Sequence, residues 1–229
     1  MRAAGGSEIM GMDIYTYGDP EADVLLIQMV DDHDMEVIEQ EVSYIRGLTG
    51  GKDFFLKAVK VNSWNKDLSP WTAPAVFGNE DFGSGAAATL RYLLEEVLKD
   101  GCVESRAGAD KKIFLGGYSL AGLFALWAGY RTDRFAGIAA ASPSIWFPHF
   151  TEYMKEHSLL TPAVYLSLGD REEKTRNPVM SQVGNAIREG YAVLQAAGAD
   201  CILEWNEGNH FKEPDLRTAR AFAWLIGRL

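Results

Sequence analysis

Ser119 stands where an apolar segment, a glycine turn and a helical pattern meet. The apolar run 113–115 precedes the turn, and the pattern 120–130 follows it. Gly117 two residues before the serine, and the small Ala121 two residues after it, permit the strained turn that lifts a nucleophilic hydroxyl above a sheet. Ala121 replaces the second glycine of the G-x-S-x-G pattern, and a serine that only caps the following helix is the alternative. The context predicts that Ser119 is a nucleophile.

His210 is the histidine best placed to serve as the base of this serine. A serine hydroxyl needs a positioned base at neutral pH. His210 follows the apolar run 201–205 and precedes the final helical pattern, as the chain order serine, acid, histidine requires. The remaining histidines, His33, His149 and His157, are interpreted as surface or pocket-lining side chains.

Three acidic residues follow the apolar run 163–168, where the carboxylate that orients the histidine is expected. Glu172 is favoured because it lies three residues beyond Gly169, far enough to reach toward the base. Asp170 is the residue that instead suits a cap of the following turn. Glu173 qualifies by position as well, so the choice among the three stays open.

An oxyanion hole needs two backbone N–H donors beside the nucleophile. We expect one from Leu120 and the second from Asp31 or its neighbour Val30, after the early apolar run 24–30. The acidic run 31–34 also contains groups that bind metals, but adjacent residues rarely converge on one ion and an Asp commonly caps a helix. We therefore expect no metal and no cofactor, and we expect His33 to border the pocket.

Two irregular stretches, 62–85 and 142–161, are rich in aromatic residues, Pro and Gly. Long loops of this kind in a compact domain often form binding walls. We expect Trp64 and Trp146 to contact the substrate, although large aromatic residues are more often core. Further candidates for the same walls are Trp71, Phe77 and Phe147.

The rest of the chain alternates short apolar runs with amphipathic segments. Several of the runs are apolar at nearly every position, as strands covered on both faces require. This order predicts an α/β fold, doubly wound, with a mostly parallel sheet of about six to seven strands flanked by helices. The expected strands are 13–17, 24–30, 54–61, 113–115, 137–141, 163–168 and 201–205. The expected helices are 36–48, 86–98, 120–130, 178–197 and 215–229.

Length and composition favour one soluble domain spanning 1–229, with residues 1–12 as a flexible N-terminus. The formal net charge of −10 disfavours nucleic-acid and anionic-membrane partners, and no apolar run approaches the length of a membrane span. No secretory leader is recognised, so a cytoplasmic location is the default expectation. Cys102 and Cys201 are expected to be free thiols. The expected partner is a small-molecule ester, and the oligomeric state is not readable.

Four segments together resemble the putative esterase family that includes esterase D, the enterochelin and bacillibactin esterases and the antigen 85 mycolyltransferases. They are Gly117-Tyr-Ser-Leu-Ala-Gly-Leu-Phe-Ala, Ser142-Pro-Ser-Ile-Trp, the Gly-Asp-Arg-Glu-Glu loop and Gly-Asn-His-Phe. The resemblance runs from about residue 24 to the end. It implies an α/β-hydrolase fold and ester hydrolysis through an acyl-enzyme on Ser119 and His210, while the acid of the family varies and some members work as a dyad.

Some of the family's properties do not carry over. No basic cluster is present that would hold an anionic ferric siderophore, so that substrate is not expected here. Two rival functions stay open: an acyltransferase or peptidase with the same residues, and a non-catalytic binding domain that retains the fold.

Overall fold

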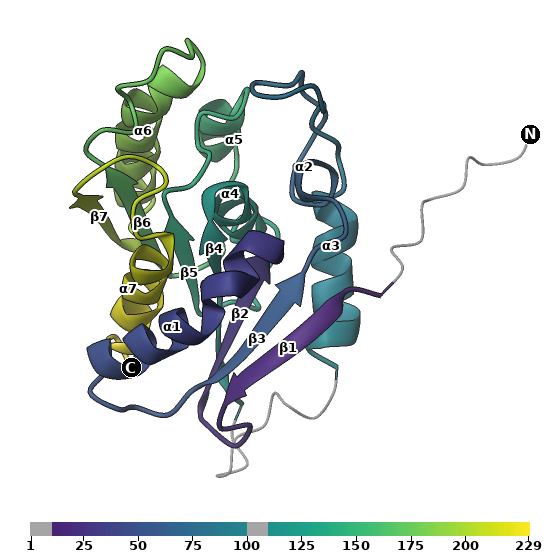
Figure 1. Cartoon of the computed structure of the whole chain (residues 1–229), viewed down its shortest axis with the longest axis vertical. Coiled ribbons are helices and arrows are strands. Elements are labelled where there is room, and N and C mark those ends of the chain that lie inside the picture. Colours follow the sequence, from purple (N-terminus) through teal and green to yellow (C-terminus); the bar gives the residue numbers. More distant parts are fainter. Residues whose placement is uncertain (1–10, 100–109) are drawn as a thin grey trace, which may run out of the picture.

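The computed structural model describes residues 11–99 and 110–229, so most of the predicted flexible N-terminus and Cys102 lie outside the described residues. One sheet of seven strands runs through the molecule in the order β1-β3-β2-β4-β5-β6-β7 (Figure 1). Strand β1 pairs antiparallel with β3, and the other pairings are parallel. The strands are β1 Asp13–Gly18, β2 Val24–Val30, β3 Phe55–Lys60, β4 Lys112–Tyr118, β5 Gly137–Ala141, β6 Ala163–Gly169 and β7 Asp200–Asn206.

Helices cover both faces of this sheet (Figure 1). Helices α1 and α7 pack together on one face, and α3, α4, α5 and α6 lie on the other. The helices are α1 Asp32–Leu48, α2 Trp64–Asp67, α3 Ala86–Tyr92, α4 Ser119–Ala128, α5 Phe150–Glu156, α6 Val183–Ala196 and α7 Pro214–Ile226. The predicted doubly wound α/β fold is therefore confirmed.

Continuous burial explains why the central strands read as unbroken apolar runs. Every residue of β2 and β5 is buried, because side chains on either face of these strands enter an apolar layer. Strand β1 differs, since it is an edge strand and all of its residues except Tyr17 are exposed.

Several predicted boundaries were wrong for local reasons. The first helix begins at Asp32, ahead of the predicted start at 36, because Asp31 and Asp34 form a capping box. The irregular stretches contain the short helices α2 and α5. The helix expected from 178 begins at Val183, after a 3₁₀ turn at Met180–Gln182.

Two smaller predictions, one on the N-terminal segment and one on the helix over 86–98, are also corrected by the structure. Met12 was placed in a flexible terminus, yet it is 5% exposed and its N–H donates to the Tyr92 hydroxyl at 3.2 Å. The helix predicted over 86–98 changes to a π-helical turn at Leu93–Val97.

No helix among the described residues combines the length and apolar character that crossing a bilayer requires.

The carboxyl ends of the parallel strands bring distant residues to one edge of the sheet, where ligands bind in folds of this kind. Asp31 follows β2, Ser119 follows β4 and Ser142 follows β5. Glu172 and His210 lie on the loops after β6 and β7. The fold thus gathers at one edge the residues that the sequence singled out.

Candidate active site

Ser119 is the first residue of α4 and lies on a strained turn, with φ of 56°. A non-glycine residue in this left-handed region costs of order 1–3 kcal/mol, which the surrounding packing must offset. Gly117 permits the turn, because a Cβ there would lie 2.5 Å from the Ala121 methyl group. The alanine that departs from the G-x-S-x-G pattern is thus accommodated against a glycine that has no side chain.

The Ser119 hydroxyl opens into a cavity shared with His210 and Ser144. Its Oγ lies 3.3 Å from the Ser144 Oγ, and the Ser144 N–H donates to the Ser119 carbonyl at 3.0 Å. In this structure the serine contacts Ser144 rather than the imidazole. Catalytic hydrogen bonds are often long or misaligned without substrate, so this geometry is compatible with a serine–histidine pair.

His210 is oriented by Glu172. Its Nδ1 lies 2.7 Å from Glu172 Oε2, with the imidazole side chain 22% exposed and the carboxylate 4% exposed. A carboxylate accepts only from Nδ1–H, so the neutral ring carries its lone pair on Nε2. This is the tautomer that a base requires.

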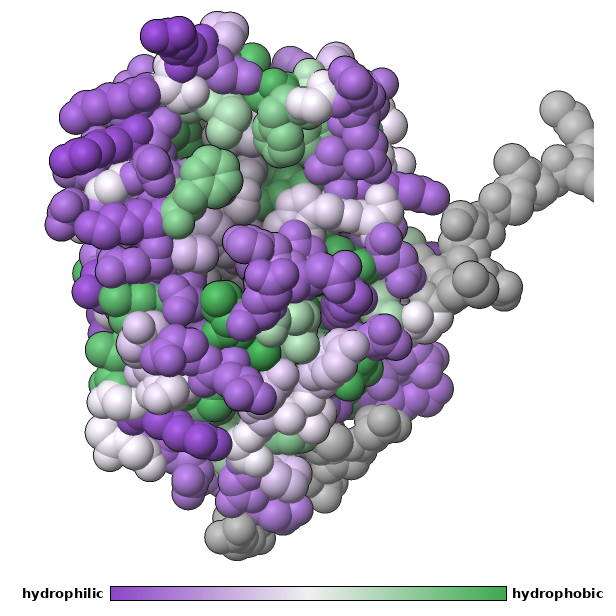
Figure 2. All heavy atoms as spheres, in the orientation of Figure 1, coloured by the Kyte–Doolittle hydropathy of each residue, from purple (hydrophilic) through white to green (hydrophobic). Residues whose placement is uncertain are grey.

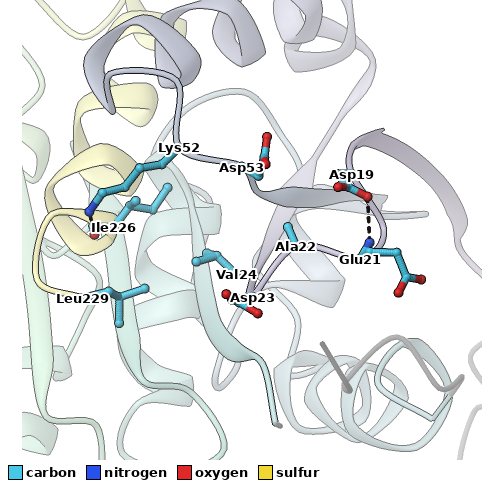
Figure 3. A pocket seen from close by; sticks show the side chains of 9 residues that line it. All are labelled: Asp19, Glu21, Ala22, Asp23, Val24, Lys52, Asp53, Ile226 and Leu229. Atoms are coloured by element: carbon cyan, nitrogen blue, oxygen red, sulfur yellow. Dashed lines mark hydrogen bonds between the residues drawn. The ribbon is translucent and has the colours of Figure 1, made fainter. Parts of the chain in front are cut away.

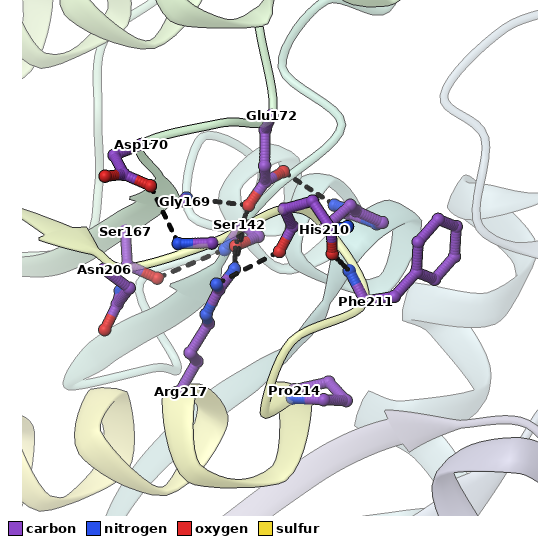
Figure 4. Close-up of polar contacts among 12 residues, drawn as sticks. Ser142, Ser167, Gly169, Asp170, Glu172, Asn206, His210, Phe211, Pro214 and Arg217 are labelled. Carbon is purple, nitrogen blue, oxygen red and sulfur yellow. Dashed lines mark hydrogen bonds and ion pairs between the residues drawn. The ribbon is translucent and has the colours of Figure 1, made fainter. Parts of the chain in front are cut away.

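The other carboxylate oxygen of Glu172 is held by three donors (Figure 4). Oε1 accepts from the Gly169 N–H at 2.7 Å and from the Ser142 hydroxyl at 2.8 Å. Arg217 Nη1 donates to the same oxygen at 3.0 Å. The buried carboxylate is therefore ion-paired and hydrogen-bonded, as a charge removed from water must be.

The two neighbouring acids point elsewhere. Asp170 Oδ1 accepts from the Gly208 N–H at 2.7 Å, so this residue fixes the loop that carries the histidine. Glu173 pairs with Arg188 at 3.3 Å on the surface. Of the three candidates, the structure brings only Glu172 to the histidine.

Arg217 was missed by the sequence analysis, although it organises the whole corner. The side chain on α7 is 2% exposed and reaches toward Glu172 (Figure 4). It donates to the Glu207 and Asn209 carbonyls, each at 3.1 Å, and so ties down the segment before His210. The available signal was an arginine among the apolar residues of the last helix, on the face that meets the sheet.

Tyr118, directly before the nucleophile, joins the same network. Its hydroxyl donates to the His210 carbonyl at 2.7 Å and accepts from Arg217 at 3.1 Å. Burial, and secondarily the charge of Glu172, raise the pKa of Tyr118 to about 12. The tyrosine therefore stays protonated and remains a donor to the histidine loop at neutral pH.

The predicted oxyanion donors differ in their surroundings. Leu120 is the second residue of α4, where a backbone N–H has no acceptor within the helix. The Asp31 N–H is directed to Asp34 Oδ2 at 3.2 Å, so a carboxylate occupies this donor. Burial first, and then the charge of Asp31, raise the pKa of Asp34 to about 7. The Asp31 N–H would have to leave Asp34 before it received an oxyanion.

The remaining side chains of the acidic run 31–34 diverge. Asp32 Oδ1 pairs with Lys60 Nζ at 2.5 Å, and His33 faces Glu36 at 3.7 Å. Among residues 11–99 and 110–229, no three or more His, Cys, Asp or Glu side chains form a cluster suited to a metal ion.

The cavity above the nucleophile has a volume of about 530 Å³. In Figure 2 an apolar hollow opens on the upper half of this face, within a hydrophilic rim. The predicted wall residues His33, Trp64, Phe77 and Trp146 line it, and the sequence analysis missed Phe211, which lines it too. Trp71 and Phe147 pack against each other with ring centroids 5.8 Å apart and do not line this cavity.

A second cavity, of about 560 Å³, lies at the opposite edge of the sheet, where β2 begins (Figure 3). Its polar side chains are four carboxylates and Lys52, whose Nζ donates to the Ile226 carbonyl at 3.4 Å. Among the described residues that line it there is no serine, histidine or cysteine. The chemistry of the lining residues therefore favours the first cavity as the active site.

Comparison with solved structures confirms the fold. The siderophore hydrolase EstA from Aspergillus nidulans superimposes with a TM-score of 0.73 at 18% identity, covering 100% of this chain and 98% of that one. An IroE-like serine hydrolase from Shewanella oneidensis gives a TM-score of 0.73 at 15% identity, over 94% of this chain and 76% of that one. The enterobactin esterase FES from Shigella flexneri gives 0.67 at 18% identity, over 95% of this chain and 56% of that one.

These neighbours identify the α/β-hydrolase fold and confirm the expected structural likeness to siderophore esterases. No family model matches the sequence, and no curated protein matches it significantly. At identities below one fifth, the likeness extends to the fold, and the activity must be argued from the residues of the cavity.

Proposed function

We propose that this protein is a serine hydrolase that cleaves carboxylic esters through an acyl-enzyme, with Ser119 as nucleophile, His210 as general base and Glu172 as the orienting acid. The carrying observation is the 2.7 Å contact between His210 Nδ1 and Glu172, which leaves Nε2 for the cavity that Ser119 enters. The names of the structural neighbours, which are esterases and hydrolases, agree with this chemistry.

The reaction follows from these positions. Ser119 Oγ attacks the ester carbonyl carbon while His210 Nε2 takes the hydroxyl proton. The imidazolium then gives this proton to the alcohol oxygen as the C–O bond breaks, and the acyl group stays on the serine. Water, activated by the same histidine, attacks the acyl-enzyme and releases the acid.

Glu172 and the N-terminus of α4 stabilise the charges that form during the reaction. The carboxylate stabilises the imidazolium that forms when His210 accepts the proton. In this proposal the Leu120 N–H, at the start of α4, donates to the carbonyl oxygen as it becomes negative. The Asp31 N–H is the second donor of this proposal, once Asp34 releases it.

Labelling with a fluorophosphonate probe tests the proposal directly. The folded protein should be labelled at Ser119 and should hydrolyse p-nitrophenyl butyrate. Ser119→Ala should abolish both reactions, whereas Ser144→Ala, which removes the neighbouring hydroxyl, should still be labelled. A folded wild-type protein that is neither labelled nor active would refute the proposal.

A further inference from the structure

The walls of the catalytic cavity carry information about the substrate that the triad does not. Two aromatic residues from segments far apart in the sequence are unusually exposed for their type: Phe77 is 52% exposed and Phe211 is 82% exposed. Both line the cavity of about 530 Å³ that contains Ser119. Large apolar surface left in water inside a concave site marks a binding region.

One wall is rigid. Trp146 packs edge-to-face against Phe77 and Phe82, with ring centroids 6.5 and 6.1 Å away. Phe82 is 3% exposed and contacts Phe147 at 5.1 Å, so this wall is anchored in the core. It presents aromatic surface to any group that enters beside the nucleophile.

Phe211, which directly follows the proposed base, lines the same cavity from the loop after β7. Its ring contacts the His210 imidazole at 5.6 Å with an interplanar angle of 85°, and it points away from Glu172 (Figure 4). A substrate ring that enters this cavity would meet apolar surface from Phe211 and from Trp146, which both line it. Aromatic pairs prefer such edge-to-face or offset contacts, with centroids about 4.5–7 Å apart.

Charge restricts the substrate further. Asp31 and Asp34 line the cavity, and none of its lining residues within the described chain is Lys or Arg. A negative group on the substrate would thus meet carboxylates and no cation of fixed charge. Two unit charges of like sign repel more strongly near a protein surface than in bulk water.

On the basis of the ester hydrolysis proposed above, we infer that the preferred substrates are esters with an aromatic group beside the reacting carbonyl, on the acyl or the alcohol side, and no negative charge on that group. Trp146, Phe77 and Phe211 hold the ring. Asp31 and Asp34 disfavour anions. A cationic substituent is accepted, because the same carboxylates attract it.

Two series of esters with matched reacting groups test this inference at pH 8. The acyl series starts from ethyl 3-phenylpropanoate and its analogue with a cyclohexyl ring in place of the phenyl ring. It also includes ethyl 3-phenylpropanoate with a carboxylate or a trimethylammonium group at the para position of the phenyl ring. The alcohol series consists of the corresponding arylmethyl and cyclohexylmethyl acetates. Acid release in a pH-stat gives kcat/KM for each ester.

In at least one series, kcat/KM for the ester with the aromatic ring should exceed that for its cyclohexyl analogue by about 2- to 10-fold. This ratio corresponds to the free energy of an aromatic pair. The para carboxylate should lower kcat/KM by about tenfold, and the trimethylammonium group should not lower it. Equal rates for all members of both series would overturn the inference and leave the hydrolase intact. Absence of any Ser119-dependent hydrolysis would instead refute the proposed function.

Variants separate the ring contact from the charge. Phe211→Ala should raise KM for the preferred aromatic ester about tenfold. Phe211→Leu should give a KM between those of the wild type and Phe211→Ala. Tyr15→Ala, at a 41% exposed aromatic residue on β1, is the matched control and should change nothing.

For the charge, Asp34→Asn should reduce the discrimination against the para-carboxylate ester. Asp32→Asn should not, because Asp32 lies on the same helical turn but pairs with Lys60 outside the cavity lining. Equal effects of the two variants would remove the role assigned to Asp34.

Discussion

Buried or partly buried carboxylates occur on two sides of Ser119, in opposite environments. On the β6–β7 side, Glu172 is 4% exposed and lies 3.0 Å from the Arg217 guanidinium, and it also accepts hydrogen bonds from Gly169, Ser142 and His210. On the β2 side, Asp34 and the 3% exposed Glu41 have no Lys or Arg partner among the described residues. Their hydrogen bonds come from a backbone N–H and from Gln28.

The carboxyl groups on the β2 side have raised pKa values, and two buried atoms beside them lack hydrogen-bond partners. Burial raises the pKa of Asp34 to about 7 and the pKa of Glu41 well above its usual value. The Gln28 Oε1 and Glu41 Oε1 atoms are buried without a hydrogen-bond partner. The β6–β7 side therefore surrounds its carboxylate with an ion pair and hydrogen-bond donors, whereas on the β2 side Asp34 loses its proton only as pH rises through about 7.

The largest effect is expected from Glu172→Gln. The amide no longer stabilises the imidazolium and can favour the wrong histidine tautomer, so kcat should fall by roughly 10³- to 10⁴-fold. Steady-state hydrolysis of p-nitrophenyl butyrate measures this fall. Asp170→Asn and Glu173→Gln are the controls and should retain most of the rate. Full activity in Glu172→Gln would show that the site works as a dyad.

Arg217→Met tests the ion pair on the same side. Removing one partner leaves Glu172 buried without a counter-charge, which costs about 3–5 kcal/mol in the free energy of unfolding. Urea unfolding should show this loss. Arg220→Met, on the same helix, breaks a half-exposed pair with Glu204 at 3.1 Å and should cost less than about 1 kcal/mol. Similar losses in the two variants would show that the buried ion pair of Arg217 contributes no more to stability than the half-exposed pair of Arg220.

Asp34 should make stability depend on pH in the opposite sense from a salt-bridged acid. Its pKa is raised from 3.8 to about 7 in the folded protein, so the folded state binds the proton more tightly than the unfolded state. Stability from this group is full below about pH 4 and is lost as pH rises toward and through 7, by roughly 2–4 kcal/mol.

Urea unfolding between pH 4 and 8 checks this dependence. Asp34→Asn should lose stability less steeply over this range than the wild type. The exposed Asp32→Asn should follow the wild-type curve. An Asp34→Asn curve parallel to the wild type would contradict the raised pKa.

The smallest effect is expected from Glu41→Gln. Because burial keeps Glu41 protonated above the usual pH for a glutamate, a neutral amide of similar shape should change unfolding free energy by less than about 1 kcal/mol at pH 5. As pH rises through the folded pKa of Glu41, the wild type should lose stability relative to the variant. A loss at pH 5 as large as that of Arg217→Met would break the contrast between the two sides.

The sequence by itself determined the order of strands and helices and the positions of Ser119 and His210. Apolar runs, helical periodicity and the glycine turn are local patterns, and each is visible within about 15 residues of chain. The chain order then placed the histidine on the last loop, because successive β-α units must return each strand end to the same edge of a parallel sheet.

Only the tertiary structure decided which acid faces His210, because Asp170, Glu172 and Glu173 all qualify by position along the chain and the sequence merely favoured Glu172 for its reach. The choice depends on contacts from other loops, including the Ser142 hydroxyl 30 residues away. Arg217 likewise reaches Tyr118 across 99 residues. Such contacts have no local pattern, since burial and partner geometry arise only when separate β-α units pack together.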